Sequence, residues 1–181
     1  MARPQRDAAA GVFHVFTHCV WAAGALFVDD IDRTTHLREL ARATVRFDWT
    51  CVAFCLLQTH YHLLLEVETG ALSAGMQQLN WRYAMQFNQR HRLRGHVLFD
   101  RFGARRIVAD SDLLSTYRYI VMNPVEAGVC AAPHHWPWSS YAGTVDLPEP
   151  QTFVNPQLVL GCFAGPPELS RAKLRAFVEK S

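Results

Sequence analysis

Long apolar runs and paired cysteines are both scarce in this chain of 181 residues. No stretch approaches the ~20 apolar residues that a membrane-spanning helix needs, and residues 1–11 lack the apolar centre of a signal peptide. The five cysteines are odd in number and include no CxxC pair. A disulfide framework or a structural zinc site is therefore disfavoured. We expect free thiols, with Cys51 and Cys55 in the core, in a cytoplasmic protein without a membrane partner.

Lysine is scarce as well, and arginine carries nearly all of the positive charge. The formal net charge is only +2, but the arginines are unevenly distributed. Residues 82–106 contain one acid and seven arginines: Arg82, Arg90, Arg92, Arg94, Arg101, Arg105 and Arg106. A planar guanidinium suits phosphate groups, and a basic segment of this kind is typical of proteins that bind a polyanion. A solvated helix face is the alternative explanation for a single run of charge.

The triplet His60-Tyr61-His62 lies in an apolar, β-prone stretch that reads as a strand. Side chains alternate along a strand, so His60 and His62 project from the same face and Tyr61 points away from them. Two neutral imidazoles placed in this way can bind a divalent cation and leave positions open for substrate oxygens. The alternative is a pair of polar positions on a half-exposed strand.

A second segment, residues 111–124, has the apolar spacing of a short helix. Ser111 is a plausible N-cap and Pro124 a natural stop. Tyr119 and Asn123 are four residues apart and therefore lie on one face, about one turn from each other. A tyrosine hydroxyl beside an amide oxygen that could complete a metal shell is a specific arrangement. Taken alone, it could also be a surface tyrosine followed by a helix-ending asparagine.

Together the two segments resemble the single-tyrosine HUH transposases, and among them the REP-associated tyrosine transposases. The resemblance extends over residues 13–143 and is carried by residues 13–19, 27–33, 60–62, 83–90, 94–102, 119–129 and 136–141. The most specific block begins Tyr119-Ile120-Val121-Met122-Asn123-Pro124. One departure concerns the Pro-Asn pair that commonly precedes the first histidine in the family, because this chain has Gln58-Thr59 there.

The resemblance implies a metal-dependent enzyme that cleaves and rejoins single-stranded DNA beside a hairpin. It implies Tyr119 as the nucleophile that forms a 5′-phosphotyrosine, and Mg²⁺ or Mn²⁺ held by His60, His62 and Asn123. The expected DNA contacts are Arg94, Arg101, Arg105, Arg106 and Arg118. The expected protein is a nucleoid-associated monomer or homodimer. The alternatives are a catalytically silent protein that binds hairpin DNA and a metal-dependent hydrolase of small phosphate esters, which would leave the arginines without a purpose.

The order of elements predicts an α+β protein with a ferredoxin-like split βαβ arrangement. We expect about four antiparallel strands with helices on one face, and the nucleophile on a following helix. The predicted strands are residues 12–20, 49–57, 60–67 and 105–108, and the predicted helices are residues 30–47, 73–92, 111–124 and 167–178. Residues 1–11 are expected to be a flexible N-terminus and 12–145 the transposase domain. Residues 146–181 are expected to be a C-terminal tail with a short helix, which could dock onto the body or contact DNA.

Several aromatic side chains have no role fixed by these patterns. Trp81, Tyr83 and Trp138 could stack on bases, although core packing explains them equally well. The remaining histidines lack a partner at comparable spacing and are interpreted as surface or structural residues: His14, His18, His91, His96, His134 and His135.

Overall fold

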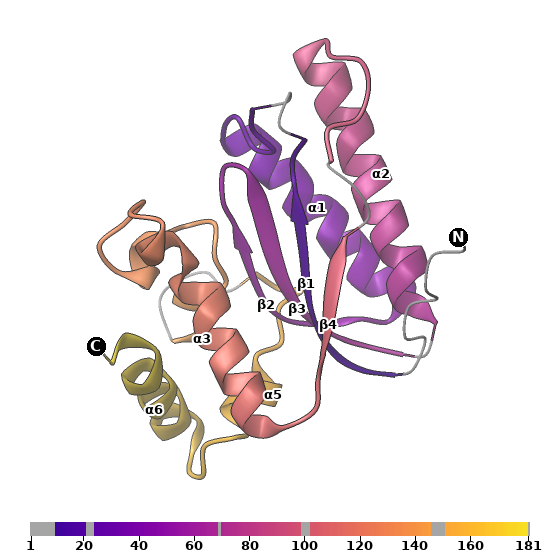
Figure 1. Cartoon of the computed structure of the whole chain (residues 1–181). Helices are drawn as coiled ribbons and strands as arrows, with labels where there is room; N and C mark the ends of the chain where they lie inside the picture. Colours follow the sequence, from indigo (N-terminus) through magenta and orange to yellow (C-terminus); the bar gives the residue numbers. More distant parts are fainter. Residues whose placement is uncertain (1–9, 21–23, 69, 99–101, 146–150, 181) are drawn as a thin grey trace.

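The computed structural model describes residues 10–20, 24–68, 70–98, 102–145 and 151–180 (Figure 1). Arg101 and nearly all of the predicted flexible N-terminus lie outside these described residues. The elements that build the body are β1 (Gly11–His18), α1 (Asp30–Phe47), β2 (Thr50–Leu56), β3 (His60–Val67), α2 (Ala71–His91), β4 (Gly103–Ile107) and α3 (Asp110–Glu126). The short helices α4 (Tyr141–Thr144) and α5 (Gln157–Leu160) follow, and then α6 (Pro167–Glu179). None of the helices in these ranges combines the length and apolar character needed to cross a bilayer.

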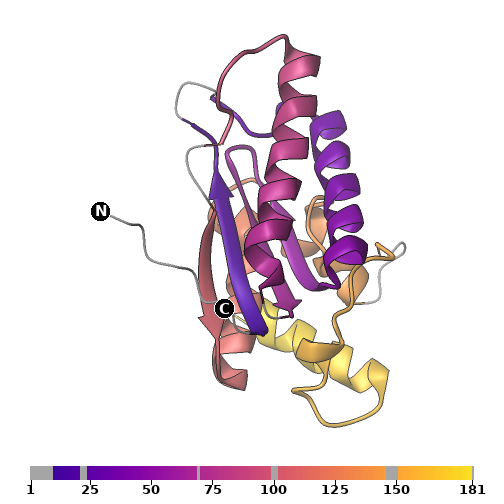
Figure 2. The same ribbon diagram turned by 90° about the vertical axis from the view of Figure 1, so that its right-hand side faces the viewer.

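The four strands form one antiparallel sheet in the order β2-β3-β1-β4. This is the split βαβ order that the sequence predicts, with β3 inserted between β1 and β2. Helices α1 and α2 pack together on one face of the sheet, as expected (Figure 2). The following helix α3 covers the opposite face, a placement that the sequence analysis did not specify. The sheet therefore has an apolar core on each side.

Strand β3 shows how alternation divides its residues between the two cores. Tyr61 and Leu63 contribute to the core beneath α1 and α2, whereas Leu64 contributes to the core beneath α3. The predicted burial of Cys51 and Cys55 is confirmed, and burial raises the pKa of the Cys51 thiol to about 12. All five cysteines are free. A strand covered on both faces reads as a nearly continuous apolar run, which explains the sequence Leu63-Leu64-Leu65.

Helix boundaries differ from the predictions at three points. Helix α3 begins at Asp110 after Ala109, so Ser111 is inside the first turn and is not the N-cap. Pro124 lies within the last turn of α3 and does not end the helix. Helix α2 begins at Ala71, preceded by Gly70 with φ 78°, so Ser73 does not cap it. Helices α3 and α2 therefore both begin without a side-chain hydrogen bond from the N-cap residue.

The C-terminal segment docks onto the body, which is one of the two possibilities left open by the sequence. Leu174 and Val178 of α6 are fully buried in the core that contains α3, and α3 and α6 lie side by side (Figure 1). The Arg118 side chain donates from Nε to the Val178 carbonyl at 3.0 Å and from Nη2 to the Lys180 carbonyl at 2.9 Å. Arg118 therefore holds α6 against α3. Its expected role as a DNA contact stays a prediction.

Replacing Gly75 with alanine is expected to destabilise the fold. A Cβ at this position would lie 2.1 Å from Cζ2 of Trp49, a buried ring that also stacks on Phe47. Overpacking costs about 1–3 kcal/mol, and it outweighs the gain of about 1 kcal/mol that alanine brings to a helix interior. Urea denaturation should show a net loss of up to about 2 kcal/mol. The exposed Ser73→Ala should change stability by less than about 0.5 kcal/mol, and Trp49→Phe combined with Gly75→Ala should recover part of the loss.

Candidate active site

The pairing of β1 with β3 gathers histidines on the sheet face that α3 covers. His18 is paired with His60, and Phe16 with His62. Because directly paired residues project from the same face, these four side chains form one row of neighbours. The ring centroids of His60 and His62 are 5.1 Å apart, and Tyr61 is buried on the other face, where its hydroxyl donates to Asn80. The alternation predicted for the triplet is confirmed.

His62 is almost completely buried, with 4% of its surface exposed. Its Nδ1 lies 3.1 Å from Nε2 of His14, whereas its own Nε2 is buried without a hydrogen-bond partner among the described residues. Burial, together with the neighbouring His14 and His60, lowers the pKa of His62 to about 3. The imidazole is therefore neutral at physiological pH, the form that binds a metal ion.

His60 is held at both ring nitrogens. Its Nε2 lies 3.2 Å from Oδ1 of Asn123 in α3, and its Nδ1 lies 3.0 Å from Oγ1 of Thr59. Burial lowers the pKa of His60, although the Asn123 contact opposes that shift. Thr59 belongs to the Gln58-Thr59 pair that departs from the family pattern, and its hydroxyl orients the first histidine. The Gln58 carbonyl accepts from the backbone amide of Leu26 at 2.8 Å and thereby fixes the turn before His60.

Helix α3 places Tyr119 beside these histidines. Its buried side, which includes Tyr117, packs into the core beneath the sheet. Tyr119 itself remains 45% exposed, and its ring lies edge-on to two histidines. Its ring centroid is 5.4 Å from that of His62 and 5.8 Å from that of His14. Asn123, one turn later, reaches His60.

Sequence reasoning missed the contribution of β1. His14 is buried against His62, and the ring of the exposed His18 lies 5.2 Å from that of His60, so both have histidine neighbours that their spacing in the sequence did not reveal. The available signal was the alternation of His14, Phe16 and His18, which places all three on one face of a strand. That this face is shared with His60 and His62 depends on the register between β1 and β3, which no local pattern specifies. Other histidines do pair elsewhere, such as His91 with Asp32 at 2.9 Å.

A hollow of about 380 Å³ opens beside Tyr119, and His14, Arg105, Ser115 and Thr116 line it with the tyrosine. Arg105 donates to the Asp112 carboxylate at 2.8 Å and to the Thr116 hydroxyl at 2.6 Å. Its side chain is still 51% exposed. The hollow therefore contains the guanidinium group of Arg105, which is fixed in place beside Tyr119. A group of this kind can bind an anion.

The other arginines expected to bind DNA differ in their surroundings. Arg94 is exposed just after the end of α2, which lies at the same end of the sheet as the turn before His60 (Figure 1). Arg106 is exposed on β4, where its Nη2 donates to the Ala10 carbonyl at 2.9 Å. Arg90, in the same basic segment, forms ion pairs with Asp29 and Asp32. The basic segment therefore contains both accessible and structurally engaged arginines.

The donors at this site fit a divalent cation. Two neutral imidazoles and one amide oxygen converge from β3 and α3, and the buried Nε2 of His62 has no other partner in the described part of the chain. Nitrogen and oxygen donors of this kind suit a first-row or alkaline-earth divalent ion. Within the described residues no cluster of three or more His, Cys, Asp or Glu side chains could hold a metal. Asn123 brings an amide oxygen within 3.2 Å of Nε2 of His60.

The topology and the tyrosine-bearing helix on the far face define a ferredoxin-like α+β fold of the kind found in tyrosine transposases. The structure of a REP-associated tyrosine transposase bound to a REP hairpin matches with a TM-score of 0.66 and 16% sequence identity, covering 92% of this chain and 93% of that chain. A candidate transposase from Deinococcus radiodurans R1 gives a TM-score of 0.46 with 12% identity, over 73% of this chain and all of the other. The sequence matches no protein-family model and no curated protein. The chain therefore has the fold of a REP-associated tyrosine transposase.

Proposed function

We propose that this protein is a metal-dependent single-stranded DNA transesterase of the transposase type, which cleaves and rejoins DNA near hairpins. The observation that carries the proposal is the position of Tyr119. Its half-exposed ring lies against His62 and His14, and Asn123 on the same helix contacts His60. A reactive hydroxyl next to a set of metal ligands is the arrangement that phosphoryl transfer to tyrosine requires. The structural neighbour bound to a REP hairpin supports a hairpin as the DNA partner.

In the proposed reaction the Tyr119 hydroxyl oxygen attacks the scissile phosphorus. The bond between phosphorus and the 3′ oxygen breaks, leaving a 5′-phosphotyrosine and a free 3′-OH. The proton lost by the phenol is balanced by the one that the 3′ oxygen takes up. His60, His62 and Asn123 would hold Mg²⁺ or Mn²⁺. When bound, this cation supplies positive charge where negative charge develops in the transition state. Arg105, which lines the hollow beside Tyr119, would bind a phosphate oxygen of the strand.

His14 has a positioning role in this proposal. A hydrogen bond from Nδ1–H of His62 to Nε2 of His14 leaves the lone pair of His62 on Nε2, the buried atom without another partner. The opposite direction would put a proton on that atom and prevent it from binding a metal. His14 would therefore act as the acceptor that selects the metal-binding tautomer of His62, as second-shell groups do at many metal sites.

His14→Leu is expected to weaken Mn²⁺ binding by about 10- to 100-fold, because the tautomer of His62 is no longer fixed. His14→Gln should keep most of the affinity, since its Oε1 can accept the same hydrogen bond. Calorimetric titration of DNA-free protein with Mn²⁺ measures the affinity, and long-range ¹⁵N–¹H NMR identifies the His62 tautomer. Equal losses in both variants with an unchanged tautomer would rule out this role.

The proposed function is tested by incubating the protein with a labelled library of single-stranded hairpins and Mn²⁺. The expected product is a protein–DNA adduct that survives a denaturing gel, is absent with EDTA, and yields a nucleotide-bearing peptide containing Tyr119 by mass spectrometry. Sequencing the bound fraction would identify the target. If hairpins bind but no adduct forms with any metal, the hypothesis of a catalytically silent hairpin-binding protein replaces that of an enzyme. Release of phosphate from small esters without an adduct would favour the hydrolase.

A further inference from the structure

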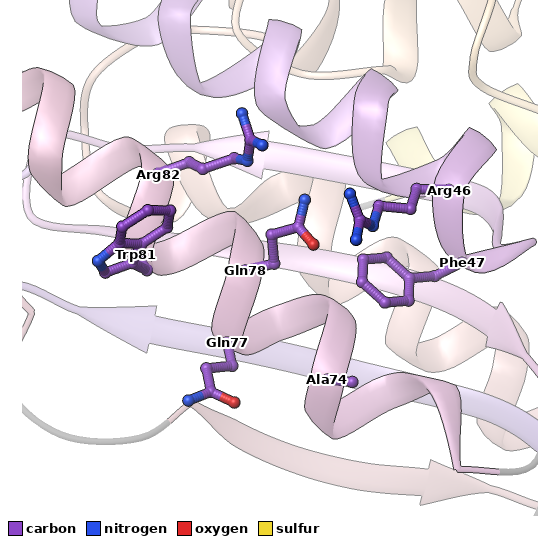
Figure 3. A pocket seen from close by; sticks show the side chains of 7 residues that line it. All are labelled: Arg46, Phe47, Ala74, Gln77, Gln78, Trp81 and Arg82. Carbon is purple, nitrogen blue, oxygen red and sulfur yellow. The ribbon is translucent and has the colours of Figure 1, made fainter.

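A second hollow, of about 700 Å³, lies between the last turn of α1 and the first half of α2 (Figure 3). We call it the α1–α2 groove, defined by Arg46 and Phe47 of α1 and by Gln77, Gln78, Trp81 and Arg82 of α2. Helices α1 and α2 cover the sheet face opposite to α3, so this groove is on the other side of the sheet from Tyr119. The reaction proposed for Tyr119 does not involve these residues.

The groove is basic, and within the described ranges its two guanidinium groups have no carboxylate partner. No acidic residue lines it, and among the described residues neither Arg46 nor Arg82 has a carboxylate partner. The Nε of Arg82 is buried and makes no hydrogen bond to the described protein. Figure 3 shows the side chains of Arg46, Gln78 and Arg82 extending into the space between the two helices. Two guanidinium groups that have no protein anion to bind are well suited to successive phosphates.

The groove also contains an exposed aromatic surface. Trp81 is 59% exposed, whereas Tyr83 two residues later is only 1% exposed and belongs to the core. Gln77 and Trp81 are one helical turn apart, as are Gln78 and Arg82, and all four residues line the groove. Of the three aromatics considered from the sequence as base-stacking residues, Trp81 is the exposed one, because Tyr83 is buried and Trp138 is half-buried against the core.

We infer that the α1–α2 groove binds a segment of single-stranded DNA, with phosphates on Arg46 and Arg82 and a base stacked on Trp81. An unpaired base presents its face to an indole, whereas a base inside a duplex has both faces covered by its neighbours. The glutamine amides can donate to and accept from the base edges. The ligand class rests on the proposed function, since it takes DNA as the substrate. The groove would hold a part of the strand remote from the reacting phosphate.

The test measures binding of a fluorescein-labelled oligothymidine of about 15 nucleotides to the full chain, without metal and at several salt concentrations. Trp81→Ala should weaken binding by about 5- to 100-fold, and Trp81→Phe should retain much of the affinity because a flat ring remains. Arg46→Gln combined with Arg82→Gln should reduce the slope of log K against log[salt] by about 1.4, the value for two lost single-strand phosphate contacts. Arg38→Gln removes one exposed arginine of α1 outside the groove and serves as the charge control. With oligonucleotides containing 5-iodouracil, photocrosslinking should attach DNA to Trp81.

Affinity, salt slope and crosslinking that are unchanged in the groove variants would overturn the inference, and so would an equal effect of Arg38→Gln. If an acidic peptide binds in the groove and single-stranded DNA does not compete with it, the groove is assigned to a protein partner instead. The outcome is separable from that of the proposed function. If the tyrosine adduct forms while groove variants bind DNA normally, only the groove inference fails. If the groove variants lose DNA binding while no adduct forms with any metal, the groove inference holds and the proposed enzymatic function fails.

Discussion

Tyr119→Phe is expected to abolish formation of the covalent DNA adduct and to lower strand cleavage by about 10³-fold or more, because the attacking oxygen is removed. The phenyl ring can keep its edge-on contacts with His62 and His14, so the neighbouring ligands should stay in place. Hairpin binding and Mn²⁺ binding should therefore be close to those of the unchanged protein. Gel analysis of the adduct, combined with equilibrium binding of the same hairpin, separates loss of chemistry from loss of substrate.

Tyr117→Phe is the matched control for this experiment. It removes a hydroxyl from the same helix two residues earlier, at a position that is fully buried in the core beneath α3. Adduct formation should persist in this variant. An adduct that survives in Tyr119→Phe, or that disappears equally in Tyr117→Phe, would remove Tyr119 from its proposed role as the nucleophile.

Acidification is expected to destabilise the metal-free protein strongly between pH 6.5 and about 3. Burial is the main cause that lowers the pKa of three histidines, to about 4 for His14 and to about 3 for His36 and His62. Their pKa in the unfolded chain is about 6.5. As the pH falls below that value, the unfolded chain takes up protons that the folded chain does not bind, so the free energy of unfolding decreases. The effect ends near the folded-state pKa values.

The expected size of this effect is large relative to the stability of a small domain. Each histidine contributes about 1.4 kcal/mol per pH unit, so the three together remove up to about 6 kcal/mol between pH 6.5 and 5. Total stabilities are typically about 5–15 kcal/mol. Urea denaturation at a series of pH values, with EDTA present, measures the slope directly.

His36→Phe isolates one of the three contributions. His36 is completely buried among Phe27, Tyr61 and Tyr83, and neither of its ring nitrogens has a hydrogen-bond partner in the described structure. A phenyl ring can occupy the same aromatic site without taking up a proton. The loss between pH 6.5 and 5 should then be smaller by about 2 kcal/mol. An identical pH dependence in both proteins would show that His36 is not protonated on unfolding.

The sequence by itself determined the local features of the candidate site and the order of its elements. Alternation placed His60 and His62 on one face of a strand, and the helical period placed Tyr119 and Asn123 on one side of a helix. Both periods are properties of the backbone and can be read within about eight residues. The split βαβ order followed in the same way, because strands β1, β2 and β3 and the long helices of the body each have their own apolar pattern.

Only the tertiary structure decided which distant residues meet. The register of β1 against β3 brought His14 to His62 and His18 to His60, and the packing of α6 on α3 engaged Arg118 in holding the C-terminal helix. The exposure of Trp81 and the burial of Tyr83 depend equally on how α1 and α2 pack together. These outcomes follow from contacts between residues tens of positions apart, which depend on register and packing. Local periodicity specifies the face on which a side chain lies, but not the partner that this face will meet.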